Sequence, residues 1–592
     1  MHLSGLDWII IAVFFFISLV IGLSVYKKAG KDSRSFFLGG RNLPWWLLGV
    51  SMVATTFSAD TPNLVTDFVR TGGVAANWGW WAFLLTGMLT VFVYARLWRR
   101  SGITTDLEFY ELRYSGPQAR FLRAFRAIYL GVFFNVIIMA SVLLAGIKIA
   151  GILLGLSAIQ TVLLISVITV LYSSLGGLRG VILTDFFQFI IAMIGMIWAC
   201  IYIVKLPEIG GLSALLSHPD VALHKNFLPD FSQWETVLPL FIIPIAVQWW
   251  SVWYPGAEPG GGGYIAQRML SAKNEKNAVM ATLLFNIAHY ALRPWPWILI
   301  ALASIVVFPE LSDLSSRFPG IEASKVQNDL AFPAMLSYLP TGLLGLVIAA
   351  LIAALMSTIS THLNWGSSYM VHDFYKRFLK PAAGEKEQVM AGRIFTVLLM
   401  VIAAFFALKL SNALQAFNIL LQIGAGTGLL FILRWFWWRI NALCEIVAMI
   451  VSFVIALIME FVVKDALLPH EKLVTGVVLT SICWIITAYI TKPTDQNVLI
   501  SFYKLIRPYS KGWKPVIDEG KQSGTIVGGA LSTGRLTIEI LLMVMGCFGV
   551  YSLLFGTGFA LYSQTIPAIV SFLVTLVVFI VGARLWNTIN DY

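Results

Sequence analysis

Apolar segments long enough to cross a membrane follow one another through almost the whole of this 592-residue sequence. A helix needs about 20 mostly apolar residues to span the hydrocarbon core of a bilayer. Hydrophobic residues make up 58% of the chain and charged residues only 12%. This pattern excludes a soluble protein and predicts an all-α polytopic membrane protein.

We predict about fifteen spans from these apolar runs. The predicted spans are residues 6–26, 45–70, 74–97, 121–150, 158–175, 181–205, 237–266, 278–308, 341–370, 388–408, 413–434, 441–463, 473–491, 537–556 and 561–586. Most of the 41 lysines and arginines fall in the loops on one side. Because such loops stay in the cytoplasm, we expect an inner-membrane protein with its N-terminus outside and its C-terminus inside.

Two predicted spans contain residues that interrupt a membrane helix. The second span carries the polar run 54–63, with an acid and a proline, and the seventh carries Pro255-Gly256, then Pro259 and four glycines. Proline removes a backbone donor, and free backbone groups at membrane depth are tolerated only where they line a cavity or bind something. A simple kink would explain the seventh span alone. The two breaks lie five spans apart and run in opposite directions, which is typical of the central site of an inverted-repeat transporter.

This pairing predicts a five-plus-five inverted-repeat fold with flanking helices. The expected units are an N-terminal span with its loop (1–44), a first repeat (45–205), a second repeat (237–434), two flanking spans (441–491), a cytoplasmic loop (492–535) and two C-terminal spans (536–592).

Hydroxyl side chains gather on one face of the predicted span 341–370. Ser357, Ser360 and Thr361 stand at positions i, i+3 and i+4, with Ala354 on the same face and Thr358 at its edge. Hydroxyl oxygens without a neighbouring base are suitable ligands for a weakly held cation such as Na⁺. The same residues can instead bond to the carbonyl one turn earlier or join two helices.

Several ionisable residues lie at membrane depth, where they are functional candidates by default. Asp60 and Glu258 fall in the two breaks, and Asp185 lies about one turn into the sixth span. Asp60 can instead simply cap the helix that follows Pro62, and Asp185 can cap its own helix or pair with Arg179. His289 and Arg293 share one face of the eighth span, where the arginine can alternatively reach towards the membrane surface.

Four motifs together resemble the sodium:solute symporter family, which includes sodium/glucose cotransporters and bacterial proline and sialic acid symporters. They are SMVATTFSAD, GGLRGVILTDFFQ, YIAQRMLSAK and AALMSTIS continuing to MVHDFY. The likeness covers roughly residues 1–490. It implies the five-plus-five fold and solute uptake coupled to Na⁺ by alternating access.

The resemblance also implies binding residues. A main Na⁺ site would use the carbonyls of Ala54, Phe57 and Ala354 and the hydroxyls of Ser357 and Thr358. A second Na⁺ site, present in some members, would use Asp185, Ser357, Ser360 and Thr361. The substrate positions would fall near Thr56, Ser58, Asp60, Thr61, Tyr254, His289 and Gln422.

The residues themselves add further solute candidates in and near the broken seventh span. They are Gln248, Trp253 and Glu258, together with Arg293 in the eighth span. Aromatic faces suit a sugar ring, and the polar groups can bind hydroxyls. We therefore expect a hydroxyl-rich solute, a sugar or sugar acid. The long Gly/Pro break, a histidine where a sugar transporter has lysine, and two extra C-terminal spans depart from the sugar-transporting pattern.

The leading hypothesis is a Na⁺-coupled symporter, with Na⁺ and a small organic solute as its ligands. A proton-coupled symporter using Asp60, Asp185 and His289 is the nearest alternative, followed by a transporter-like membrane sensor. No HExxH or GxSxG motif appears, so we expect no enzyme activity. The lysines and arginines flank apolar spans, so the net charge of +11 reflects the orientation of the spans in the membrane rather than nucleic-acid binding. No obligate protein partner is expected.

Overall fold

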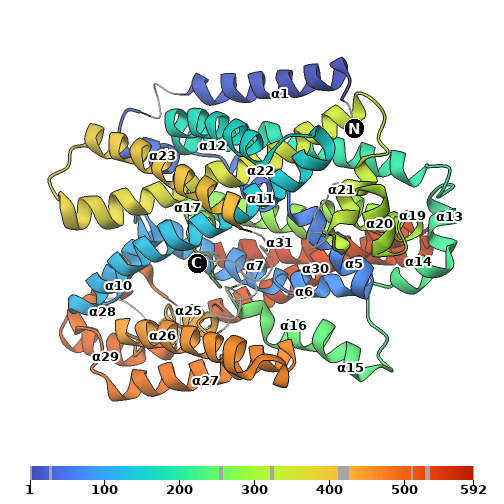
Figure 1. Cartoon of the computed structure of the whole chain (residues 1–592). Coiled ribbons are helices and arrows are strands. Elements are labelled where there is room, and N and C mark those ends of the chain that lie inside the picture. Colours follow the sequence, from blue (N-terminus) through green and yellow to red (C-terminus); the bar gives the residue numbers. More distant parts are fainter. Residues whose placement is uncertain are drawn as a thin grey trace.

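The computed structural model describes residues 3–25, 30–252, 258–319, 326–410, 424, 426–508, 511–526 and 534–590. These residues form helices joined by short turns, and their only β-type contact is an isolated bridge between Leu43 and Ala272. The helices lie side by side in one bundle (Figure 1). The predicted all-α class is confirmed.

Within the described part of the chain, eleven helical stretches are long and apolar enough to cross a membrane. They are Gly5–Ser24, Val74–Ser101, Gly116–Leu154, Gly176–Val204, Glu275–Val307, Leu343–Leu379, Glu385–Lys409, Ala442–Val463, Pro469–Ile490, Arg535–Leu561 and Thr565–Thr588. Shorter apolar helices, Trp45–Thr56, Ala158–Leu171 and Trp234–Ala246, stand where three further spans are expected. The predicted span 413–434 begins in residues outside the described part. The total of fifteen therefore stays a prediction.

The helices used below are α1 (Gly5–Ser24), α4 (Trp45–Thr56), α5 (Thr61–Gly72), α7 (Leu84–Leu89), α9 (Phe109–Arg113), α10 (Gly116–Ile128), α11 (Asn135–Leu154), α12 (Ala158–Val204), α16 (Ile243–Ala246), α17 (Gly263–Ser271), α18 (Glu275–Ile287), α19 (Pro294–Val307), α22 (Leu343–Tyr369), α23 (Glu385–Lys409), α25 (Gly428–Leu433), α26 (Ala442–Ile458), α30 (Gly534–Leu561) and α31 (Thr565–Asn590).

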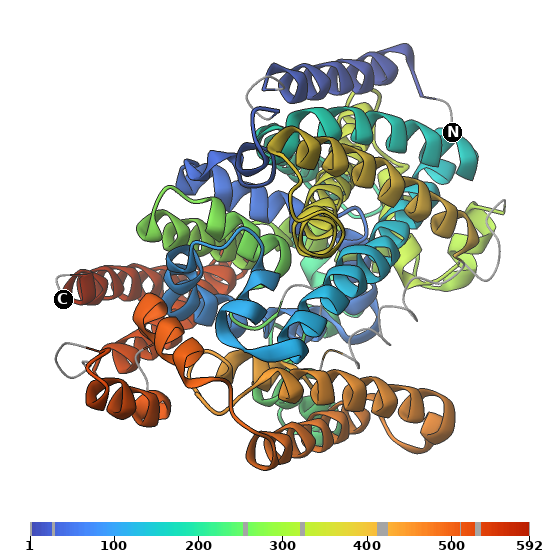
Figure 2. The ribbon, with the colours of Figure 1, turned by 90° about the vertical axis from the view of Figure 1, so that its left-hand side faces the viewer.

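Helix α22 lies at the centre of the bundle. It packs against α12, α23, α1, α11 and α4, and nearly all of its side chains are buried. Seen after a quarter turn, the yellow helix in the middle is viewed almost along its axis, with other helices around it (Figure 2). A helix that is apolar on every face belongs in such an interior. The hydroxyl groups of α22 are therefore also inside the protein.

The first turn of α22 is tied to the start of α1. Ser4 and Asp7 form a capping box on α1, and Asp7 Oδ1 also accepts the N–H groups of Gly342 at 2.7 Å and Gly345 at 2.9 Å. The first N–H groups of a helix have no partner in their own helix. One carboxylate thus satisfies donors at the N-termini of two neighbouring helices.

Helix α12 contains both the fifth and the sixth predicted spans, with a sharp bend at Gly177 (φ 54°, ψ −162°). A Cβ atom at this position would lie 2.7 Å from the carbonyl oxygen of Phe36. Only glycine combines this backbone conformation with so close an approach. The bend places Asp185, in the second half of α12, next to α4 and α22.

The C-terminal helices α30 and α31 pack against each other as an antiparallel pair. Helix α30 also contacts α7, and Trp295 of α19 donates a hydrogen bond to the carbonyl of Leu554 at 3.0 Å. Most apolar side chains of α31 are exposed. The two extra predicted helices are thus present, and α31 presents an apolar surface that suits lipid.

Candidate sodium and solute site

The described helices are interrupted at both predicted breaks, although Pro255 and Gly256 of the seventh span lie outside the described residues. Helix α4 ends at Thr56 and α5 begins at Thr61, with Pro62 in its first turn. Helix α16 ends at Ala246, whereas α17 begins only at Gly263. The carbonyl groups in the last turn of a helix have no partner within that helix. Each break therefore offers backbone oxygen atoms inside the bundle.

Five hydroxyl residues surround Asp185 and the end of α4. We call Ser51, Thr55, Ser357, Thr358 and Thr361 the hydroxyl cluster. Ser357 and Ser51 donate to the two Asp185 oxygens, at 2.7 and 2.6 Å. The Thr55 and Thr361 hydroxyl oxygens lie 2.9 Å apart. All five side chains are buried, so this is a polar interior joining α4, α12 and α22.

The predicted main Na⁺ residues meet along the contact between α4 and α22. The Thr358 hydroxyl donates to the Thr55 carbonyl at 2.9 Å and to the Ala354 carbonyl at 3.1 Å. On the other side, the Phe57 N–H bonds to the carbonyl of Ala54 at 3.2 Å. Thr358 thus contacts the Ala354 carbonyl that the resemblance implies and the Thr55 carbonyl that it does not, and among the described residues no hydrogen bond joins it to the carbonyls of Ala54 or Phe57. A cation at this contact would be bound by both helices.

The predicted second Na⁺ residues are close to a positive charge of the protein. Arg268 of α17 donates to the Thr361 hydroxyl at 2.7 Å, and its Nη2 lies 3.8 Å from Asp185 Oδ2. The hydroxyl of Ser360 donates instead to the Ser357 carbonyl at 3.0 Å. Sequence reasoning missed Arg268, although it stands inside the YIAQRMLSAK motif.

Three predicted solute residues form a connected group. His289 Nδ1 lies 3.0 Å from the Thr56 hydroxyl, and His289 Nε2 lies 3.3 Å from Arg293 Nη2. A guanidinium can only donate, so Nε2 accepts and the proton of the neutral ring is at Nδ1. The guanidinium of Arg293 is also 5.2 Å from the centre of the Trp297 ring. Arg293 is buried, so it does not extend to the membrane surface.

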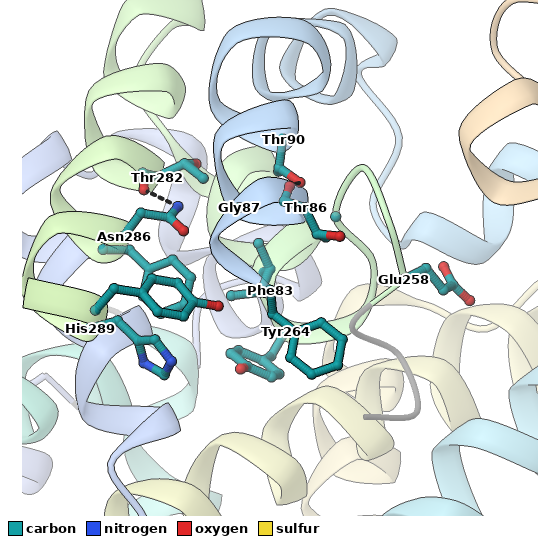
Figure 3. A pocket seen from close by; sticks show the side chains of 13 residues that line it. Phe83, Thr86, Gly87, Thr90, Glu258, Tyr264, Thr282, Asn286 and His289 are labelled. Atoms are coloured by element: carbon teal, nitrogen blue, oxygen red, sulfur yellow. Dashed lines mark hydrogen bonds between the residues drawn. The ribbon is translucent and has the colours of Figure 1, made fainter. Parts of the chain in front are cut away.

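A small cavity of about 50 Å³ lies between α7, α18 and the start of α17. Its lining consists of Phe83, Thr86, Gly87, Thr90, Glu258, Gly261, Tyr264, Ile265, Thr282, Phe285, Asn286, His289 and Tyr290. Figure 3 shows Asn286 and His289 on one side and Thr86 and Thr90 on another. The mixture of apolar walls with a few polar groups is typical of a small-molecule site, but the volume is well below the roughly 300–1,000 Å³ of such a site, so a solute could enter only after the cavity widens.

Of the predicted solute residues that the structure describes, only His289 and Glu258 line this cavity. Thr86 and Thr90 were missed, although their i, i+4 spacing puts them on one face of an apolar span. Asn286 was also missed: its amide nitrogen donates to the Thr282 carbonyl at 2.8 Å, while its buried Oδ1 has no partner among the described residues. That oxygen is available to a solute hydroxyl.

The remaining solute candidates lie elsewhere. Asp60 is exposed at the N-terminus of α5, where its side chain makes no capping hydrogen bond. Thr61 lies next to it, Ser58 is buried in the break, and Gln248 donates to the Gly79 carbonyl at 2.7 Å. The other three, Trp253, Tyr254 and Gln422, fall outside the described residues.

Glu258 is paired with arginines. It accepts a hydrogen bond from Arg126 of α10, and Arg434, directly after α25, lies 3.5 Å from its other oxygen. Arg434 also approaches Glu445 of α26 at 3.4 Å. We call Arg126, Arg434, Glu258 and Glu445 the arginine–glutamate cluster. In Figure 3 the Glu258 carboxylate is turned away from the other labelled side chains.

The comparisons with known proteins agree with this geometry. The pattern of the sodium:solute symporter family matches residues 36–452. The sodium/glucose cotransporter of Vibrio parahaemolyticus is 28% identical over 483 residues, which cover 77% of this chain and 86% of that protein. The sodium/mannose cotransporter of Bos taurus is 26% identical over 468 residues, 74% of this chain and 76% of that protein.

Among solved structures, a Na⁺-coupled sialic acid symporter in a substrate-bound outward-open state has a similar fold. Its TM-score is 0.69 at 22% identity, with 83% of this chain and 99% of that chain covered. The chain belongs to the sodium:solute symporter family, whose members here are Na⁺-coupled secondary transporters and not enzymes.

Proposed function

We propose that this protein uses the inward flow of Na⁺ to take up a small hydroxyl-rich solute, a sugar or sugar acid, by alternating access. The observation that carries the proposal is the contact of Thr358 with the Thr55 carbonyl at the broken end of α4. The relatives named for glucose and mannose support a sugar-like solute. So does a cavity with threonine and asparagine groups between aromatic walls.

The main Na⁺ site would use the carbonyls of Ala54, Phe57 and Ala354 with the hydroxyls of Ser357 and Thr358. These ligands are neutral, so they can hold Na⁺ without making its release too costly. The ion would join α4 to α22. Because an ion bound by both helices favours one packing of the two, its binding would shift the population of conformations that bind the solute.

A second Na⁺ at Asp185, Ser357, Ser360 and Thr361 stays a prediction. Arg268 already places a positive charge 3.8 Å from the Asp185 carboxylate. A second ion therefore requires Arg268 to move away from Thr361 during the cycle. The number of Na⁺ ions per solute is thus linked to the position of α17.

The solute would lie at this cavity, between Thr86, Asn286 and His289, in a conformation in which the cavity is wider than its present volume of about 50 Å³. Thr56 and Arg293 would support it indirectly, because both hydrogen-bond to His289. Asp60, Ser58, Thr61, Gln248, Trp253, Tyr254 and Gln422 stay candidates for the path that leads to this cavity.

The proposed arrangement has fifteen spans, inverted repeats at 45–205 and 237–434, an outside N-terminus and a cytoplasmic C-terminus. Cysteines introduced at the exposed positions Arg34 and Lys386 test the orientation. Both should react with an impermeant reagent only after the cells are opened. Labelling of either one in intact cells would contradict it.

Counterflow uptake in proteoliposomes tests the function itself. We expect uptake of a sugar or sugar acid with Na⁺ at fixed pH, and none when K⁺ replaces Na⁺. A pH gradient at constant Na⁺ should have little effect. Full uptake in K⁺ driven by the pH gradient would instead establish proton coupling. Solutes for this assay can be chosen by the Na⁺-dependent rise that they cause in thermal stability.

A further inference from the structure

The arginine–glutamate cluster lies between the cavity and three other helices. Glu258 lines the cavity and precedes α17 in the broken seventh span. Its partners come from distant parts of the chain: Arg126 from α10, Arg434 from the end of α25 and Glu445 from α26. Ion pairs in this cluster thus connect the broken seventh span to α10, α25 and α26.

All four charged side chains are buried. Their exposed fractions are 4% for Arg126, 2% for Arg434, 3% for Glu258 and 1% for Glu445. Burying a charge is costly unless a partner of opposite charge compensates it, and removing one partner leaves the other uncompensated. Glu445 lies 3.9 Å from Arg126 and 3.4 Å from Arg434 and balances one of the two positive charges. The other charge needs an anion at the position of Glu258 while both arginines stay buried.

The other members of the cluster are anchored independently of Glu258. Buried Arg113 donates to the carbonyls of Arg434, Trp437 and Trp438, each at 3.1 Å. The Tyr114 hydroxyl donates to Glu445 at 2.6 Å. These contacts fix the backbone at Arg434 and the side chain of Glu445 to the end of α9. The guanidinium of Arg126, on α10, lies over the rings of Tyr110 and Phe431, 5.5 and 5.0 Å from their centres.

Glu258, by contrast, is carried by irregular backbone. Gly260 and Gly261 follow it with φ values of 85° and 86°, a region that favours glycine. The segment is not held by the continuous hydrogen bonding of a helix. A change in the broken span can therefore move Glu258 while the arginines stay in place.

The two arginines also have unused hydrogen-bonding capacity. The Nε atoms of Arg126 and Arg434 are buried and have no partner among the described residues. Guanidinium groups bind carboxylates best through two parallel N–H donors. The pair can therefore bind more than the single carboxylate that it now contacts.

We propose that Glu258 is a tethered anion in a two-arginine site, and that a carboxylate on the transported solute replaces it there. The solute class is then a small hydroxyl-rich carboxylate, such as a uronate, rather than a neutral sugar. This inference rests on the proposed solute transport. In this inference Glu258 does not bind the solute directly. It competes with the solute carboxylate for the two arginines.

Purified protein in lipid nanodiscs, at fixed pH and Na⁺, tests this directly by thermal unfolding. The probes are D-glucuronate and D-glucose, which differ in the carboxylate. In Glu258→Gln we expect a lower unfolding temperature, which D-glucuronate restores and D-glucose does not. Because the competing carboxylate is gone, half-saturation should need about tenfold less D-glucuronate than in the wild type.

A matched control is Glu539→Gln. Glu539 is also a buried glutamate, paired with buried Arg96 at 2.5 Å, but it does not line the cavity. We expect this variant to lose stability without recovery in D-glucuronate. The double variant Glu258→Gln/Arg434→Gln should lose the response as well. If Glu258→Gln does not fold, Glu258→Asp keeps the charge with a shorter reach and should show an intermediate half-saturation.

An equal response to D-glucose, an equal response in Glu539→Gln, or no response in the Glu258 variants would overturn the inference. Its failure is distinguishable from failure of the proposed function. Na⁺-dependent counterflow of a neutral sugar without any effect of D-glucuronate would leave symport intact. Uptake independent of Na⁺ would reject symport whatever the thermal shifts.

Discussion

The hydroxyl cluster and the arginine–glutamate cluster are two buried polar regions with opposite designs. The first places one carboxylate, Asp185, among the hydroxyls of Ser51 and Ser357, with a single arginine, Arg268, 3.8 Å away. The second sets two arginines against two glutamates. Neutral oxygens bind a cation weakly enough to release it, whereas buried opposite charges hold each other strongly. The hydroxyl cluster suits an ion that binds and is released in each cycle. The arginine–glutamate cluster suits ion pairs that stabilise one conformation.

The start of α17 connects these two regions. Glu258 precedes this helix and enters the arginine–glutamate cluster, while Arg268 within it reaches Thr361 of the hydroxyl cluster. A displacement of α17 would therefore change the charge in both clusters at once. This suggests how ion binding at α22 and opening of the broken span can be coupled, and each cluster can be tested separately.

The largest effect is expected from breaking the arginine–glutamate cluster. Arg434→Met removes a cation and leaves Glu258 and Glu445 with less compensation. We expect a loss of about 3–5 kcal/mol in stability, measured by thermal or denaturant unfolding in nanodiscs. Arg439→Met is the control, because Arg439 only donates to carbonyls near the end of a helix. If both variants lose the same unfolding free energy, the arginine–glutamate cluster does not stabilise the protein more than an ordinary arginine contact does.

The next largest effect should come from the hydroxyl cluster and should change function more than stability. Thr358→Val keeps the shape of the side chain but removes a proposed Na⁺ ligand. We expect at least a tenfold higher Na⁺ concentration for half-maximal uptake, equivalent to about 1.4 kcal/mol. Ser367→Ala is the comparison, because the buried Ser367 hydroxyl belongs to neither proposed Na⁺ site and donates to the Asn364 carbonyl of its own helix at 3.0 Å. An unchanged Na⁺ dependence in Thr358→Val would place the main site elsewhere.

A smaller change is expected where the two regions meet. If a second Na⁺ binds beside Asp185, Asp185→Asn should lower the Hill coefficient for Na⁺ from about two towards about one. Thr361→Val should have the same effect, measured as uptake against Na⁺ concentration. A wild-type coefficient of one, unchanged in both variants, would mean that Arg268 supplies the positive charge there throughout the cycle.

The last prediction concerns the pH dependence of stability rather than a single variant's loss. Asp106 lies in the loop before α9 and accepts hydrogen bonds from the Tyr369 hydroxyl and from the Gly263 N–H. Burial, followed by the negative charge of Glu258, raises the pKa of Asp106 to about 7. The unfolded chain loses this proton near pH 4, whereas the folded protein keeps it to about pH 7.

Stability contributed by protonated Asp106 is therefore present in acid and is lost as the pH rises to about 7, by up to about 1.4 kcal/mol per unit. The difference in unfolding free energy between wild type and Asp106→Asn should change over this range and become constant above it. Asp220→Asn, at an exposed position, is the control. A constant difference from pH 5 to 8 would contradict the assignment.

The sequence by itself determined the features that depend on local chemistry. Span-length apolar runs must be helices in a bilayer, and Pro62 and the glycines around Pro259 must interrupt them, because the backbone there lacks donors or regular geometry. The spacing of Ser357, Ser360 and Thr361 likewise placed them on one helix face. These conclusions need no knowledge of which helices are neighbours.

Only the tertiary structure decided which side chains meet. Glu258 pairs with arginines on α10 and directly after α25. Arg268 donates to Thr361 and lies near Asp185. Both sets of contacts arise because segments far apart in the chain pack together. Ser360 shares a face with its neighbours but bonds to its own helix. The rotation and depth of each helix set these contacts, and they follow from the packing of the whole bundle rather than from the spacing within any one segment.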